Sequence, residues 1–280
     1  MGARGRLYVV ATPIGNLEDL TLRARAVLAE ADVVAAEDTR HTRILLARHG
    51  LERPLVSLHE HNEDAQSASL IVRLEAGESV ALVSDAGTPL ISDPGYRLVR
   101  RAAEAGIEVV AVPGPSAVTA ALSVSGLATD RFAFEGFLPS RSSARRKALT
   151  ALQAETRTLV FFESSHRIRD CLEDLRDLFG PERPAAVCRE LTKQFETVLR
   201  GTLAELCQRV AEDADQRKGE FVLVVAGAST ETAAGMAAAL ELARALHEHV
   251  GLSQAARIAA KLHGVPRREV YEQIEKKGSG

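Results

Sequence analysis

Aromatic residues are scarce in this sequence, and tryptophan is missing altogether. Aromatic side chains make up 4% of the 280 residues, whereas hydrophobic residues make up 46%. The core must therefore be built from leucine, valine and alanine rather than from large rings. A chain of this length and composition can bury the cores of one large or two medium-sized globular domains.

The sequence also lacks long apolar runs, closely spaced cysteines and an excess of positive charge. No apolar run is long enough to span a membrane, and the N-terminus has no signal-type cleavage site. Cys171, Cys188 and Cys207 form no Cys-x-x-Cys pair, which argues against a structural zinc site and suits a reducing compartment. We expect a cytoplasmic protein with no membrane partner. With a net charge of −3, any nucleic-acid binding must come from local basic patches.

Short apolar runs alternate with helical patterns along most of the chain. The expected strands of the first half are residues 7–11, 32–36, 54–58, 80–83 and 107–112. A second series follows at residues 131–134, 158–162, 185–189 and 221–226. This alternation predicts an α/β fold with mostly parallel pairing. We place domains at 1–126 and 127–229, followed by a helical segment at 230–280 that is broken at Gly264-Val265-Pro266.

The most informative stretch is VALVSDAGTPLISDP, residues 80–94. An apolar run stops at Ser84-Asp85 and passes into a turn built from Gly87 and Pro89. The carboxyl ends of strands in an open α/β sheet are the usual place for small-molecule binding. Two ordinary turns after a buried strand would give the same pattern, so this stretch alone leaves both interpretations open.

Other strand ends also deliver polar residues. Asp38 or Thr39 can cap the helix that follows residues 32–36. His59 and His61 would share one face of a strand, as a metal site needs, but no third ligand is evident. We therefore predict no metal site. Ser164 and Ser165 lie outside a G-x-S-x-G elbow, which disfavours serine hydrolysis.

Basic residues gather in two places. Arg141, Arg145, Arg146 and Lys147 follow the motif GFLP, and a second group lies in the C-terminal helical segment. Residues 253–271 have the pattern of a small helix–turn–helix, which can meet a phosphate backbone. A packing element or a dimer contact is the alternative interpretation.

Eight motifs occur together in a fixed order: TPIGNL (12–17), AEDTRHT (36–42), HEHN (59–62), SDAGTPLISDPG (84–95), PGPSA (113–117), GFLP (136–139), FFESSHRI (161–168) and RELTK (189–193). In these motifs the chain closely resembles the bacterial 16S rRNA (cytidine 2′-O)-methyltransferases of the tetrapyrrole methylase superfamily. The resemblance implies two α/β domains with S-adenosylmethionine in a cleft between them. Carried onto this chain, it implies cofactor contacts at Pro13, Asp85, Ala86, Gly87, Ile91, Pro115, Ser116, Glu163 and Val222.

The resemblance implies methylation of a ribose oxygen of a cytidine in the decoding centre of 16S rRNA, within the small ribosomal subunit, by a homodimer. Removing the hydroxyl proton calls for an acceptor; the candidates are Glu37, His59, His61 and His166. The candidates for RNA phosphate contacts are Arg40, Arg141, Arg145, Arg146, Lys147, Arg167, Arg189 and Lys193. Two alternatives stay open: a porphyrinoid methyltransferase of the same fold, and a nucleic-acid-binding regulator that senses the cofactor.

Overall fold

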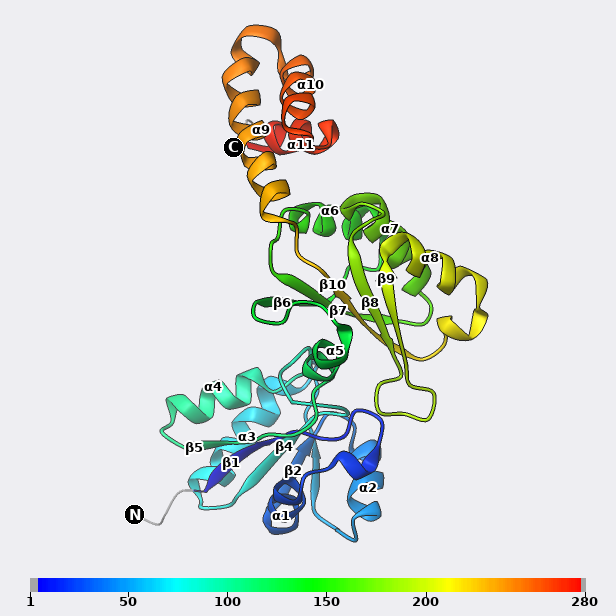
Figure 1. Cartoon of the computed structure of the whole chain (residues 1–280). Helices are drawn as coiled ribbons and strands as arrows, with labels where there is room; N and C mark the ends of the chain where they lie inside the picture. The colour runs from blue at the N-terminus through cyan, green and yellow to red at the C-terminus, as the bar shows by residue number, and fades with distance from the viewer. Residues whose placement is uncertain (1–4, 278–280) are drawn as a thin grey trace. The chain divides into compact units, whose positions relative to one another are not determined.

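A computed structural model describes residues 5–277, and the contacts between residues divide the chain into two compact units (Figure 1). The first unit runs to Ser123 and also includes Arg189–Thr197. The second unit consists of Val124–Cys188 and of the chain from Val198 onward. The sequence-based division at residues 126 and 229 stays a prediction about independently folding parts.

The first unit contains a five-stranded sheet in the order β3-β2-β4-β1-β5, and every neighbouring pair is parallel. Its strands are β1 (Arg6–Val10), β2 (Val33–Ala36), β3 (Leu55–Ser57), β4 (Val80–Val83) and β5 (Glu108–Val112). Its helices are η1 (Leu17–Asp19), α1 (Leu22–Glu30), α2 (Thr39–Arg48), α3 (Glu63–Glu75), α4 (Tyr96–Glu104) and α5 (Ala117–Ser125). The five expected strands are confirmed, and so is the parallel pairing.

Two interior strands of this sheet, β2 and β4, are buried along their whole length, because helices cover both faces. Every residue of β2 and β4 is buried, as is typical of a parallel sheet between two helical layers. Val34 and Val83 belong to the cluster that packs with α1 and α2. Val33 and Leu82 belong to the cluster that packs with α3 and α4. The alternation of side chains along each strand therefore divides the core into two layers.

The second unit contains a mixed sheet in the order β6-β7-β10-β8-β9. Its strands are β6 (Phe132–Phe137), β7 (Thr158–Ser164), β8 (Pro184–Arg189), β9 (Thr197–Thr202) and β10 (Glu220–Val225). The pairing of β6 with β7 is parallel, and that of β7 with β10 is antiparallel. The helices α6 (Ser142–Leu152), α7 (Ile168–Phe179) and α8 (Leu203–Glu212) pack on one face of this sheet (Figure 1), and η2 (Ala214–Arg217) precedes β10.

The sequence did not predict β9. Its residues are half-exposed or exposed, and Arg200 lies in its centre, so no apolar run marks it. The other expected strands of this half are confirmed with shifted ends. β9 occupies an edge of the sheet, where a strand needs only one partner and can keep polar side chains.

Three helices follow β10: α9 (Thr230–Val250), α10 (Leu252–His263) and α11 (Arg267–Lys277). They have a small core of their own, to which α10 contributes Ala255, Ala256, Ala259 and Ala260. Gly264 ends α10 in the left-handed conformation, with φ of 64°. The expected helical segment and its break at Gly264 are confirmed. Among the described residues, no helix combines the length and the apolar character needed to cross a bilayer.

Candidate active site

Three strand ends of the first unit are joined by hydrogen bonds. After β1, the Thr12 amide donates to the Gly87 carbonyl at 2.8 Å, and the Gly87 amide donates back to the Thr12 carbonyl at 3.0 Å. The Thr88 hydroxyl donates to the Pro115 carbonyl, at the end of β5, at 3.3 Å. The structure therefore brings together Pro13, the segment around Gly87 and Pro115, which belong to three separate motifs.

Gly87 meets a requirement that only glycine satisfies easily. It is buried and has φ of +81°, and a Cβ atom built on it would lie 3.4 Å from Ile14 Cγ2. Positive φ is unfavourable for side chains with a Cβ. The backbone at this turn is therefore free of side-chain bulk, which permits close approach of a ligand.

The segment that continues from Gly87 to α4 is strained and is anchored at its far end. Leu90 and Ser92 both have positive φ, 73° and 69°, which residues other than glycine seldom adopt. The nearly buried Glu63 accepts hydrogen bonds from the amides of Gly95 and Arg97, both at 2.9 Å. This carboxylate takes the place of a side-chain cap at the start of α4. Ile91, between the two strained residues, is 41% exposed.

A pocket of about 420 Å³ lies beside these loops within the first unit. It is lined in part by Ile14, Pro115 and Ser116. Asp19 and Thr192 also line the pocket, and the sequence did not predict them. In the structure, each has a buried side-chain oxygen without a hydrogen-bond partner. Unpaired buried oxygens are costly, so both oxygens are suited to receive a polar ligand or water.

Carboxylates gather at the ends of β2 and β4. Asp85 Oδ1 accepts a hydrogen bond from the Asp38 amide at 2.9 Å, and Asp85 Oδ2 lies 3.1 Å from His41 Nδ1. Burial and the nearby Asp85 raise the pKa of Glu37. Burial, followed by the charge of Glu37, raises the pKa of Asp93 to about 6. Asp93 was not predicted as a site residue.

Asp38 has a structural role in this group. As expected, it caps α2, since its side chain accepts from the Arg40 amide at 2.8 Å. The same carboxylate pairs with the Arg40 guanidinium at 2.5 Å, and this contact lowers the pKa of Asp38. The Arg40 side chain is still 82% exposed, so it can reach an external phosphate.

The histidine candidates lie in different surroundings. The rings of His59 and His61 contact each other edge to face, with centroids 5.9 Å apart, and His59 Nδ1 is buried without a partner. Within residues 5–277, no group of three histidine, cysteine or acidic side chains could hold a metal ion. His166 belongs to the second unit and is exposed.

The motif RELTK belongs by its contacts to the first unit. The Lys193 ammonium pairs with Glu190 at 2.8 Å, and the stem of Lys193 packs against Gly15. Arg189 is buried, with 9% of the residue exposed, and its guanidinium donates to the Phe195 carbonyl at 3.1 Å. Glu190 and Thr192 both have positive φ, 51° and 65°. These two basic side chains hold the segment in its unusual conformation.

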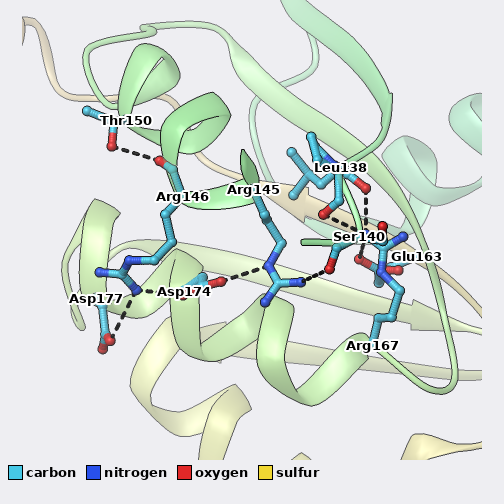
Figure 2. A network of polar contacts seen from close by, with 10 residues as sticks. Leu138, Ser140, Arg145, Arg146, Thr150, Glu163, Arg167, Asp174 and Asp177 are labelled. Carbon is cyan, nitrogen blue, oxygen red and sulfur yellow. Dashed lines mark hydrogen bonds and ion pairs between the residues drawn. The ribbon is translucent and has the colours of Figure 1, made fainter. Parts of the chain in front are cut away.

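In the second unit, the two predicted cofactor contacts fall on opposite faces of the sheet. Glu163 has a fully buried side chain that pairs with Arg167 at 3.2 Å and accepts from the Ser164 amide at 2.8 Å (Figure 2). Val222 is paired with Phe162 across β7 and β10, so both side chains lie on the other face. Both residues are nearly buried, and the Glu163 carboxylate is also paired, so neither side chain is open to a ligand within the second unit.

The basic group at the start of α6 contains both buried and exposed members. Arg145 has a side chain only 4% exposed and pairs with Asp174 of α7 at 2.7 Å (Figure 2). Arg146 pairs with the same aspartate. Arg141 and Lys147 are exposed. Arg145 therefore has no surface to offer an RNA phosphate, and its role is to hold α6 against α7.

Comparisons with known proteins agree with this arrangement of two α/β units. Residues 6–207 match the family model of the Tetrapyrrole (Corrin/Porphyrin) Methylases. Residues 231–275 match the model described as the RsmI C-terminal HTH domain. The chain therefore belongs to the tetrapyrrole methylase family. It is a methyltransferase, and its cofactor is S-adenosylmethionine.

Relatives of nearly the same length place the chain more narrowly. It is 58% identical to "Ribosomal RNA small subunit methyltransferase I" of Xylella fastidiosa strain Temecula1, over 97% of this chain and 99% of the relative. It is 49% identical to the protein of that name from Escherichia coli O157:H7, over 99% and 97%. At this level of identity and coverage, the chain belongs with the ribosomal RNA small subunit methyltransferases I.

Solved structures share the fold at low sequence identity. The chain is similar to uroporphyrin-III C-methyltransferase of Thermus thermophilus complexed with S-adenosylhomocysteine, with a TM-score of 0.55, 23% identity and coverage of 79% and 97%. It is also similar to diphthine synthase, with a TM-score of 0.60, 20% identity and coverage of 79% and 90%. These likenesses establish the fold.

Proposed function

We propose that this protein transfers the methyl group of S-adenosylmethionine to the ribose 2′-oxygen of a cytidine in the decoding centre of 16S rRNA. The substrate is the small ribosomal subunit, and the reaction takes place in the cytoplasm. The observation that carries this proposal is the relationship to small subunit methyltransferases along nearly the whole chain. The resemblance carried by the eight motifs implies that the nucleoside is a cytidine and that the methyl group goes to its ribose 2′-oxygen.

We propose that the cofactor lies against the joined strand ends of the first unit. The residues that would hold it are Pro13, Asp85, Ala86, Gly87, Ile91, Pro115 and Ser116. Backbone free of side-chain bulk at Gly87 and the neighbouring pocket of about 420 Å³ fit a ligand of this kind. Glu163 and Val222 of the second unit were predicted as contacts together with these residues, and both stay predictions. When bound, the cofactor supplies a methyl group activated by its sulfonium charge.

We propose Glu37 as the proton acceptor. The attacking hydroxyl must be held in line with the methyl group, and its proton must leave to a group within hydrogen-bond reach. Glu37 is half-buried at the end of β2, and its raised pKa makes it a better base than an exposed carboxylate. His59, His61 and His166 are the remaining candidates, and none combines burial with neighbouring carboxylates in this way.

We propose that RNA phosphates contact the exposed basic side chains rather than the whole predicted set. Arg40, Arg141 and Lys147 are exposed, whereas Arg145 lies inside the second unit. Phosphate contacts position an RNA, and contacts to 2′-hydroxyls and unstacked bases select it. We further propose a homodimer.

The test is transfer of a tritiated methyl group to small ribosomal subunits from cells that lack this enzyme, followed by nucleoside analysis. The expected product is labelled 2′-O-methylcytidine. A label found only in an added porphyrinoid, or no label with either substrate, would contradict the proposal. Tight binding of the cofactor and of RNA without any methyl transfer would instead support the alternative of a nucleic-acid-binding regulator that senses the cofactor.

A further inference from the structure

Phe137, the last residue of β6, presents a large aromatic ring to solvent. It is 57% exposed and ends an edge strand in which buried and exposed residues are mixed. A single exposed phenylalanine needs no explanation in general. This one does, because the backbone departs from regular pairing immediately before it.

The sheet register shows that a bulge turns Phe137 outward. Phe134 is paired with Val160, but Gly136 is paired with Phe161 and Phe137 with Phe162, so β6 contains one extra residue. Gly136 has φ of +64°, a conformation that glycine adopts without strain. A shift of one residue exchanges the two faces of a strand. Without the bulge, Phe137 would point toward the buried cluster that contains Ala133.

Two other rings support the outward-facing ring. The centroids of Phe137 and Phe162 are 5.5 Å apart, and those of Phe134 and Phe162 are 4.8 Å apart, both edge to face. Such contacts favour a fixed orientation of the rings. The three phenylalanines therefore form a small aromatic surface on the face of the sheet opposite α6 and α7, and Phe137 is its most exposed member.

The segment after Phe137 is held in place by two arginines (Figure 2). Arg167 donates to the carbonyl of Leu138 at 2.5 Å, and Arg145 donates to the carbonyl of Ser140 at 3.5 Å. Leu138 itself is 4% exposed and belongs to the core. The exposed ring thus stands between a bulge and an anchored loop, so little conformational entropy is lost when a ligand contacts it.

A positively charged residue follows Phe137 closely in the chain. Arg141, four residues after Phe137, is exposed at the N-cap of α6, with no side-chain cap on the helix amides. An exposed ring followed closely in the chain by a cation suits the binding of an unpaired nucleic-acid base, because the ring can stack on the base and the cation can contact a phosphate. A base inside a duplex cannot offer its face in this way.

We infer that Phe137 is a stacking platform for an unpaired base of the RNA substrate. This inference rests on the proposed function, since it assigns a contact for that RNA. Phe137 here is a binding residue, and no proton or methyl group passes through it.

The absence of tryptophan from the chain permits a direct measurement of stacking. Phe137→Trp places the single indole of the protein on this surface, and Phe132→Trp places it on the same strand before the bulge. Addition of an unpaired RNA oligonucleotide, which contains no tryptophan, should quench the fluorescence of Phe137→Trp, and that of Phe132→Trp should change much less. Equal quenching of the two variants, or no quenching of Phe137→Trp, would overturn the inference.

Steady-state kinetics of Phe137 variants distinguish stacking by an aromatic ring from contact by any large apolar side chain. Phe137→Leu should raise the KM for small subunits about tenfold to one-hundredfold, the range that one base–aromatic contact supplies. Phe137→Tyr should restore it, and cofactor affinity should stay unchanged in both variants. Phe132→Leu is the matched control, because Phe132 is 41% exposed on the same strand.

Three outcomes have distinct meanings. An unchanged KM in Phe137→Leu, while the wild-type protein methylates subunits, would overturn the inference alone. A change of sedimentation coefficient in Phe137→Leu would overturn it in favour of a contact between two copies of the chain. A wild-type protein that transfers no methyl group to subunits would instead contradict the proposed function.

Discussion

Gly87 lies at the point of the candidate site where the ends of β1 and β4 are joined. Gly87→Ala should lose most of its affinity for S-adenosylmethionine, because a methyl group would fill the space that the ligand needs beside Ile14. Gly50→Ala is the matched control: Gly50 also has positive φ, at +69°, but a Cβ there meets open space. Each variant should lose about 1 kcal/mol of stability. Calorimetric titration that finds the same cofactor affinity in Gly87→Ala as in Gly50→Ala would contradict the proposed pocket.

Glu37 is the proposed proton acceptor for the ribose hydroxyl. Glu37→Gln should lower kcat by about 10²–10⁴-fold, the usual contribution of a positioned base, and leave cofactor affinity unchanged. Glu60→Gln, which changes an exposed carboxylate after β3, should keep its activity. The base acts in its ionised form, so activity falls as the pH drops through the raised pKa of Glu37. A pH–rate profile with the same acidic limb in Glu37→Gln would exclude this role.

At this scale the sequence located some site residues and missed others. The family resemblance proposed Asp85, Gly87 and Pro115, and all three come shortly after apolar runs that mark strand ends. Asp19 and Thr192 are far apart in the sequence, and only the folded first unit places them in one pocket. The raised pKa of Asp93 likewise depends on burial beside Glu37, which no spacing reveals.

At the scale of helices and strands, the buried ion pair of Arg145 and Asp174 fixes α6 on α7. Asp174→Asn should destabilise the protein by about 3–5 kcal/mol, because it leaves the Arg145 guanidinium buried without a counter-charge. Glu173→Gln, which breaks the exposed pair with Arg169 one residue away, should cost less than about 1 kcal/mol. Urea denaturation measures both values. Equal midpoints for the two variants would show that the pair at Arg145 is no stronger than a surface pair.

Buried strands were predictable because burial on both faces leaves an uninterrupted apolar run in the sequence. β9 and the bulge in β6 leave no such pattern. The residues of β2 and β4 are apolar without interruption because both faces of a parallel strand are covered. β9 needs no such run at its edge position. The extra residue before Gly136 is visible only in the pairing with β7, since the sequence of β6 alone does not reveal its register.

At the scale of the whole molecule, Glu269 joins the C-terminal helices to the second α/β unit. It accepts a hydrogen bond from Gln153 Nε2 at 2.8 Å, and burial raises its pKa to about 7. The protonated form is favoured in the folded state, so this group contributes stability below about pH 4.5 that is lost as the pH rises through 7. Glu269→Gln should therefore flatten the decline of the melting temperature between pH 5 and pH 8.

Glu248→Gln is the control for this prediction, because Glu248 is exposed on α9. Its melting temperature should follow the same pH dependence as that of the wild-type protein. A Glu269→Gln variant that declines as steeply as the wild type would show that Glu269 titrates normally.

The contact of Arg189–Thr197 with the first unit has a consequence for how such a protein can arise. The chain leaves the first unit after Ser123, comes back for these nine residues and leaves again. Neither unit is therefore encoded by one unbroken stretch of gene. A recombination event that transferred only the first 123 residues would leave behind Arg189–Thr197, which pack with the first unit. Exchange of either unit alone would therefore break contacts within that unit's own packing.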